Sequence, residues 1–163
     1  GLLVPEGTQL VSLKKPVTSS DEQPIVGELA QVTDGDKEGG DGSYVELGPG
    51  KQWVQIDLKG ICAISAVVIW HFHGEPRVYR DVVVQVADDP DFITNVRTLF
   101  NNDYDNSIGL GIGKDLEYFE SNQGEIIDGK GEKAAYIRLY SKGNTASDMN
   151  HYTEVEVHGI PAK

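Results

Sequence analysis

The stretch WVQIDL, residues 53–58, shows the pattern that decides the fold of this chain. Apolar and polar residues alternate along it, and an extended strand places every second side chain on the same face. One face would carry Val54, Ile56 and Leu58, and the other would carry Trp53, Gln55 and Asp57. This alternation predicts a β-strand with one face in a hydrophobic core.

Six further segments have the short length and the β-branched or aromatic content of strands. They are ISAVVIWHF (64–72), DVVVQVAD (81–88), VRTLF (96–100), LEYFE (116–120), AAYIRLYS (134–141) and YTEVEVHG (152–159). Turn-forming residues separate them, including KG (59–60), DGKGE (128–132) and SKGNTASD (141–148). Helical turns are expected at most in IVGELAQV (25–32) and PDFITNV (90–96). The sequence therefore predicts an all-β sandwich or jelly roll.

The composition is that of a folded, strongly acidic protein. The chain has 163 residues, 39% of them hydrophobic, and its 14 Lys and Arg against 26 Asp and Glu give a net charge of −12. The length and apolar content predict one domain with a substantial core. The negative charge repels nucleic acid and anionic membrane surfaces, whereas divalent cations and neutral ligands suit it.

Cys62 is the only cysteine, so an internal disulfide and multi-cysteine metal or haem motifs are excluded. Its apolar neighbours predict a buried thiol. No apolar run approaches the length of a membrane span, and no signal peptide is visible. Because the chain starts at Gly1 without Met, we expect residues 1–163 to be a single module excised from a larger protein.

The acidic stretch TDGDKEGGDG, residues 33–42, matches the first half of an EF-hand calcium loop. Counted from Asp34, position 12 is Val45, where an EF-hand needs a bidentate Glu, and the residues that follow are extended rather than helical. The EF-hand interpretation therefore fails. From the residues themselves, a structural calcium loop and a hydrated acidic turn both stay open.

The segment WHFHGEPRVYRD, residues 70–81, concentrates side chains suited to sugars. Aromatic faces stack on the C–H patches of a sugar, and polar side chains form directional hydrogen bonds with its hydroxyls. We therefore take His71, His73, Arg77 and Tyr79 as candidate ligand contacts.

Other interpretations of this segment stay open. Trp70 is better suited to the core, and either histidine can also be an ordinary surface residue. A transition-metal site at His71 and His73 needs at least one further ligand, for which Glu75 and His151 are candidates.

A second polar segment, FNNDYDNSIGLGIGKD, spans residues 100–115. Asn102 and Tyr104 within it are further candidate ligand contacts. The glycines at 109, 111 and 113 do not form a phosphate loop, because no Lys-Ser or Lys-Thr pair follows and the surroundings are acidic. The cluster at 101–106 suits a second oxygen-rich cation site, a hydroxyl-binding loop or a set of Asx turns.

Six landmarks run along nearly the whole chain in the order typical of a known family. They are LVSLKKPVTSS (10–20), VTDGD (32–36), WVQIDLKG (53–60), VVVQVADD (82–89), AAYIRLYS (134–141) and TEVEVHG (153–159). Together they resemble the discoidin-like (coagulation factor five/eight type C) domains of the galactose-binding-like superfamily, a branch that includes bacterial carbohydrate-binding modules. The chain departs from that family in lacking a cysteine pair and in having VADDPD before FITNV.

The resemblance implies an eight-stranded antiparallel β-sandwich, or jelly roll, with ligand-binding loops at one end. It also implies a structural calcium ion held by Asp34, Asp36, Glu154 and backbone carbonyls of the 31–42 loop. Such an ion would connect the first loop to the last strand, so that calcium binding would stabilise the fold.

The function that the resemblance implies is that of a non-catalytic carbohydrate-binding module, secreted or at the cell surface or in the periplasm, and attached to further domains. Given the acidic surface, we expect a neutral glycan rather than an anionic one, and neither nucleic acid nor membrane as a partner. The alternative is a calcium-stabilised protein-adhesion or assembly module of the same fold. An enzyme is the third possibility, since carboxylates abound but no pair of them stands out.

Overall fold

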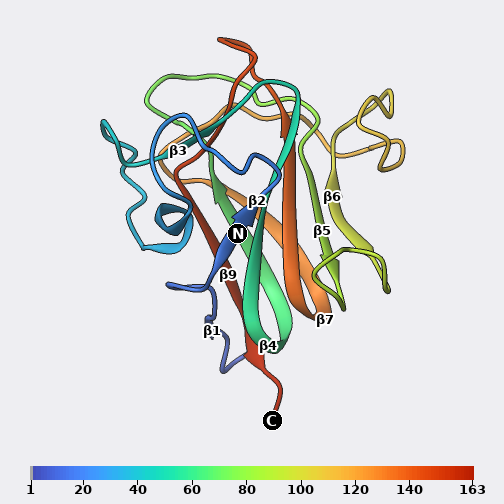
Figure 1. Ribbon diagram of the computed structural model, residues 1–163. Helices are drawn as coiled ribbons and strands as arrows, with labels where there is room; N and C mark the ends of the chain where they lie inside the picture. Colours follow the sequence, from blue (N-terminus) through green and yellow to red (C-terminus); the bar gives the residue numbers. More distant parts are fainter. Residues whose placement is uncertain (1) are drawn as a thin grey trace.

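The computed structural model describes residues 2–163, which form a β-structure with one short helix. The elements in order are β1 (Gln9–Leu10), β2 (Val17–Ser19), the 3-10 helix η1 (Leu29–Thr33), β3 (Val45–Leu47), β4 (Lys51–Trp70), β5 (Val83–Ala87), β6 (Arg97–Asn101), β7 (Glu125–Lys142), β8 (Asn150–Tyr152) and β9 (Glu154–Pro161) (Figure 1). The predicted antiparallel all-β class is confirmed, with nine strands in the described residues rather than eight.

The strands form two sheets in which every pair is antiparallel. The large sheet has the order β1-β9-β4-β7-β5-β6, with β2 paired to β4, and the small sheet consists of β3 and β8. β4 and β7 are therefore central in the large sheet: they pair with each other, β4 also pairs with β2 and β9, and β7 also pairs with β5.

Both long strands bend at the same place. β4 pairs with β7 along residues 51–57 and again along 62–69, with a shift of register between Asp57 and Cys62. Lys59 in β4 and Lys130 in β7 take left-handed backbone conformations, with φ of 61° and 57°. Figure 1 shows both strands reversing direction at the lower end of the molecule.

The bend turns one hydrogen-bonded sheet into two facing layers with the core between them. Val54 and Ile56 come from the first half of β4, Ile64 and Val67 from its second half, and all four are fully buried in one cluster. The alternation in 53–58 is confirmed, because Leu58 is also buried, 3% exposed, on the core side. Burial of such side chains is the main driving force for this arrangement.

Several predicted boundaries are wrong. The turns predicted at 59–60 and 128–132 lie where β4 and β7 reverse direction, but each strand continues through the bend instead of ending there (Figure 1). The segment 116–120 forms no strand and pairs with none, and 90–96 contains no helix. The predicted strand at 152–159 is divided between β8 and β9, which belong to different sheets.

The bends leave the long connections at the opposite end of the sandwich. The segments 71–82, 102–124 and 143–149 all follow or precede strand ends there (Figure 1). In residues 2–163 no helix has the length and apolar character needed to cross a membrane.

The bend gives a test of how tightly the two long strands approach. A Cβ atom added to Gly129 would lie 2.4 Å from the backbone oxygen of Ile64, whereas one added to Gly60 would meet no atom within 4 Å. We therefore expect Gly129→Ala to lower the free energy of unfolding by about 1–3 kcal/mol in urea denaturation. Gly60→Ala is the control and should stay within about 0.5 kcal/mol of the wild type; equal effects of the two would contradict the close approach.

Candidate ligand-binding site

Three chain segments meet at the end of the sandwich opposite the bends. The backbone N–H of Arg80 donates to the carbonyl of Gly143 at 2.9 Å, and that of Glu120 donates to the carbonyl of Arg77 at 2.9 Å. These bonds join the segment 71–82 to the other two, so that the loops form one ordered surface.

A hollow of about 270 Å³ lies on this surface. Its lining consists of Arg80, Asp81, Asn102, Tyr104, Asp105 and Glu117. The ring of Tyr104 is accessible, since the residue is 48% exposed. The hollow therefore combines one accessible aromatic ring with several polar side chains, a mixture suited to a hydroxyl-rich ligand.

Asn102 is the buried polar residue of the hollow. It is 2% exposed, and its Oδ1 accepts a hydrogen bond from the backbone N–H of Val82 at 2.8 Å. Within the described residues its buried Nδ2 has no hydrogen-bond partner. A buried donor without a partner is costly, so a ligand oxygen that accepts from Nδ2 would bind favourably.

Three aspartates gather at one side of the hollow. Asp81, Asp103 and Asp105 each offer a carboxylate oxygen within 4.8 Å of the others, an arrangement that can bind a metal ion. The hydroxyl of Ser107 lies 2.7 Å from Asp81 Oδ2 and 3.1 Å from Asp103 Oδ1. The hydroxyl has one proton, so it can donate to only one of these two carboxylates at a time.

The environments of these carboxyl groups differ. Burial raises the pKa of Asp81, and the nearby Asp103 and Asp105 raise it further. Burial also acts on Asp103, but hydrogen bonds from the backbone N–H groups of Ile108 and Ser107 outweigh it and hold the pKa below its usual value. Asp103 is therefore an ionised carboxylate that is fully buried.

The predicted ligand contacts separate into three places: the hollow, the layer beneath the loops, and the contact of His73 with Lys37. Asn102 and Tyr104 lie together in the hollow. His71, Arg77 and Tyr79 lie beneath the loops among buried aromatic rings, where the His71 and Tyr79 rings stack at 4.3 Å. The sequence therefore predicted part of one surface and part of its support.

His71 and Tyr79 are 0% and 1% exposed, which corrects the prediction that they contact ligand directly. Nδ1 of His71 lies 3.1 Å from Oε2 of Glu120, and the backbone N–H of His71 donates to Oε1 of the same carboxylate. Arg77 forms an ion pair with Glu75, and its guanidinium lies 4.7 Å from the centre of the Phe72 ring.

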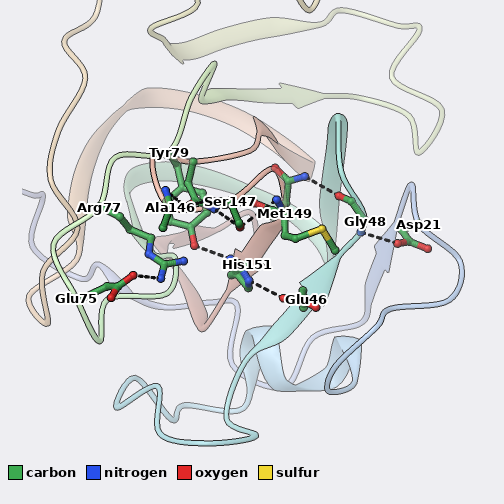
Figure 2. A network of polar contacts seen from close by, with 12 residues as sticks. Asp21, Glu46, Gly48, Glu75, Arg77, Tyr79, Ala146, Ser147, Met149 and His151 are labelled. Atoms are coloured by element: carbon green, nitrogen blue, oxygen red, sulfur yellow. Dashed lines mark hydrogen bonds and ion pairs between the residues drawn. The ribbon is translucent and has the colours of Figure 1, made fainter.

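Figure 2 shows the polar contacts that extend from Tyr79. The hydroxyl of Tyr79 lies 2.7 Å from Nδ1 of His151, and Nε2 of His151 lies 2.9 Å from Oε1 of Glu46. Burial lowers the pKa of His151, so the ring is neutral, with its proton on the nitrogen that faces the Glu46 carboxylate. Nδ1 then accepts from Tyr79, and this chain of bonds connects the 71–82 segment to β8 and β3.

The two histidines do not converge on a metal. Nε2 of His73 lies 2.7 Å from the backbone oxygen of Lys37, away from the His71 ring and its Glu120 partner. The additional ligands considered from the sequence, Glu75 and His151, are held by Arg77 and by Tyr79 respectively. This arrangement does not support the transition-metal alternative.

The predicted calcium loop does reach the last strand. The backbone N–H of Gly35 donates to Oε2 of Glu154 at 2.9 Å. Burial, together with the nearby Asp34 and Glu156 carboxylates, raises the pKa of Glu154 to about 9. Asp34 and Asp36 are both exposed and each accepts a hydrogen bond from a backbone N–H of the loop, and Asp34 is the one whose carboxylate lies near Glu154.

Several residues of the site were not predicted. Arg80, Asp81, Asp105 and Glu117 line the hollow, and Glu46 and Glu120 bond to the histidines beneath it. Asp81 and Asp105 lie within the two polar segments that the sequence analysis singled out, 70–81 and 100–115, but were not among the ligand contacts chosen there. The partners of the histidines lie far away in the sequence, and no local pattern points to them.

Solved structures share this fold. The chain is 19% identical to the family 89 glycoside hydrolase of Clostridium perfringens, with a TM-score of 0.70 over 94% of this chain, but it spans only 15% of that enzyme. The CBM32 module of AlyQ, solved with 4,5-unsaturated mannuronic acid, is 18% identical with a TM-score of 0.64 and coverage of 87% of this chain and 92% of that one. A fucose-binding module of Streptococcus pneumoniae is 20% identical, with a TM-score of 0.63. The match covers 91% of this chain and 96% of that module.

The architecture is the antiparallel β-sandwich of these carbohydrate-binding modules. This shared fold agrees with the β-sandwich that the six sequence landmarks imply. No family model and no curated protein sequence matches the chain.

The contact between Tyr79 and His151 can be tested through stability. Tyr79→Phe removes the hydroxyl and leaves Nδ1 of buried His151 without a donor. We expect a loss of about 1–3 kcal/mol in the free energy of unfolding, measured by denaturant titration. Tyr104→Phe makes the same chemical change at an exposed ring and should alter stability by less than about 0.5 kcal/mol. A Tyr79→Phe protein as stable as the wild type would show that the bond contributes nothing.

Proposed function

We propose that this chain is a non-catalytic carbohydrate-binding module whose ligand occupies the hollow between residues 80–81, 102–105 and 117. The observation that carries the proposal is the mixture of groups there. Tyr104 offers an exposed ring for the C–H face of a sugar, and Asn102 offers a buried, unpartnered donor for a hydroxyl oxygen. Arg80 adds donors, and the carboxylates of Asp81 and Glu117 add acceptors.

The structural neighbours support this class of ligand. The CBM32 module of AlyQ was solved with 4,5-unsaturated mannuronic acid. The module of S. pneumoniae is a fucose-binding module. Both neighbours match this chain over most of their own length, whereas the glycoside hydrolase matches it over a small part. A binding module attached to further domains, in a secreted or cell-surface or periplasmic protein, is the setting that fits.

The charge of the molecule favours a neutral glycan. A net charge of −12 repels polyanions at long range, and the hollow itself contains three carboxylates against one guanidinium. The same repulsion argues against nucleic acid and anionic membranes as partners.

A structural calcium ion at the 34–42 loop fits the residues present. Oε1 of Glu154 is buried and has no partner among the described residues, and the carboxylate of Asp34 faces it. Two carboxylates in this position need a cation if both are ionised, and Ca²⁺ takes six to eight oxygens, including backbone carbonyls. When bound, the ion would join the loop to β9, which Lys37 already reaches through its ion pair with Glu156 at 2.7 Å.

One observation favours the alternative of a protein-adhesion or assembly module. Ile112, Leu116 and Phe119 are 71%, 79% and 72% exposed along the segment after the hollow. Exposed apolar side chains close together in a chain are typical of protein contact surfaces. Replacing Leu116 and Phe119 with Ser should leave glycan binding unchanged if the hollow is the sugar site.

Binding to a glycan array, followed by calorimetry with the best ligand, tests the proposed function. Tyr104→Ala removes the stacking surface and should weaken binding at least tenfold, or about 1.4 kcal/mol. Ile93→Ala, at a residue that is 78% exposed in the 88–96 loop, is the control and should bind as the wild type does. Absence of binding to any glycan by the folded wild-type domain would contradict the proposal.

Chelation tests the structural calcium ion. Removing an ion present at about 100-fold over its dissociation constant costs about 2.7 kcal/mol, which lowers the melting temperature of a chain of this size by about 5–11 °C. Glu154→Gln should abolish the difference between calcium and chelator, because it removes the carboxylate charge. Asp41→Asn, at an exposed position in the same loop, should retain it. A wild-type melting temperature that is the same in calcium and in chelator would rule out the structural ion.

A further inference from the structure

The aspartates beside the hollow lack positive charge. In residues 2–163 no Lys, Arg or His nitrogen lies within 4.0 Å of the carboxylate oxygens of Asp81, Asp103 or Asp105. The Ser107 hydroxyl can donate its one proton to only one of its two carboxylate neighbours, Asp81 and Asp103. Three carboxylates so close together repel one another unless a cation or further protons intervene.

A second observation points to a ligand at the same place. Asn102 lines the hollow with Asp81 and Asp105, it is 2% exposed, and its Nδ2 has no partner among the described residues. Its orientation is fixed, because Oδ1 accepts from Val82 and so the amide nitrogen must face the other way. Because Asn102 lines the hollow together with Asp81 and Asp105, we place the acceptor for Nδ2 at the same site.

The donor set determines the kind of cation. The three aspartates supply only oxygen, which suits a hard divalent ion such as Ca²⁺ and not Zn²⁺ or Cu²⁺. Asp103 is fully buried while Asp105 is exposed, so the ion would be held from the protein side and open toward the hollow. The coordination positions of the ion on its open side would be filled by water or by oxygens of the ligand.

We propose that Asp81, Asp103 and Asp105 bind a divalent cation of the Ca²⁺ type, and that Asn102 Nδ2 donates to an oxygen bound to that cation. In the protein with ligand, that oxygen is a sugar hydroxyl, which makes glycan recognition cation-dependent; this second part rests on the proposed function. The ion is separate from the one at Asp34 and Glu154, which would act on the fold and not on the ligand.

Counting bound ions tests the proposal without any glycan. Tb³⁺ occupies oxygen-rich Ca²⁺ sites, and its emission is excited through a nearby aromatic ring such as that of Tyr104. We expect the chelator-stripped wild-type domain to bind two ions in Tb³⁺ titration and in Ca²⁺ calorimetry. The double variant Asp81→Asn/Asp105→Asn should bind one ion, and Glu154→Gln should also bind one.

The variants also separate the two sites. The site at the hollow is supported if the Tb³⁺ emission excited through tyrosine is lost in Asp81→Asn/Asp105→Asn and is retained in Glu154→Gln. A wild type that binds one ion, lost in Glu154→Gln alone, overturns it. Should the double variant fail to fold, Asp105→Asn at the exposed position must weaken the second ion at least tenfold, and an unchanged affinity would overturn the proposal.

The link to the glycan has its own measurement. In the Glu154→Gln protein, chelation should weaken binding of the best array ligand at least tenfold, because the remaining ion lies beside the sugar. Equal affinity in calcium and in chelator, with two ions counted in the wild type, would overturn the cation-dependent part. Absence of glycan binding would instead refute the proposed function. The number of bound ions would still decide whether the aspartates bind a cation.

Discussion

The long antiparallel ladder between β4 and β7 is the constraint on which the rest of the structure depends. The two strands pair on both sides of a shared bend, so a single set of hydrogen bonds belongs to both layers of the sandwich. β5 and β9 extend the sheet from β7 and β4 respectively, and the core fills the space that the bend creates. Because the bends occupy one end of the molecule, the long connections lie at the other, where they are free to carry polar and aromatic side chains.

That end of the molecule has two levels. Beneath the surface, Tyr79, His151 and Glu46 form a buried chain of hydrogen bonds that fixes one loop against the small sheet. Above it, Asn102 and Tyr104 are presented on the ordered backbone at the hollow. A buried polar network with its bonds satisfied makes the loops rigid, and a rigid site loses less conformational entropy when a ligand binds.

The fold class could be predicted from the alternation in 53–58 and from the series of short apolar segments, since both depend on local chemistry. The bends could not, because the same glycines and lysines that end a strand can also occupy a bulge within one. The segment 116–120 has the composition of a strand but pairs with none in the described residues, and Leu116 and Phe119 project from it into solvent.

The site could be predicted only in part for a related reason. A histidine and a tyrosine with polar neighbours look alike in sequence whether they face a sugar or a buried carboxylate, and the carboxylates of Glu46 and Glu120 lie far from His151 and His71 along the chain. The connection of Asp34 with Glu154 came from family resemblance, since no local pattern relates residues so far apart.

The central ladder also has a consequence for how the chain folds. Its pairs are distant in sequence, as with Ile69 and Glu125 or Lys51 and Lys142, and such non-local topologies fold slowly. During synthesis at roughly 5–20 residues per second, β4 leaves the ribosome several seconds before β7 exists to pair with it. In that interval a strand of 20 residues, with an apolar second half, lacks its final partners on both edges except where β2 pairs with it. The scaffold that makes the finished molecule rigid is thus the part most exposed to aggregation while the chain is being made.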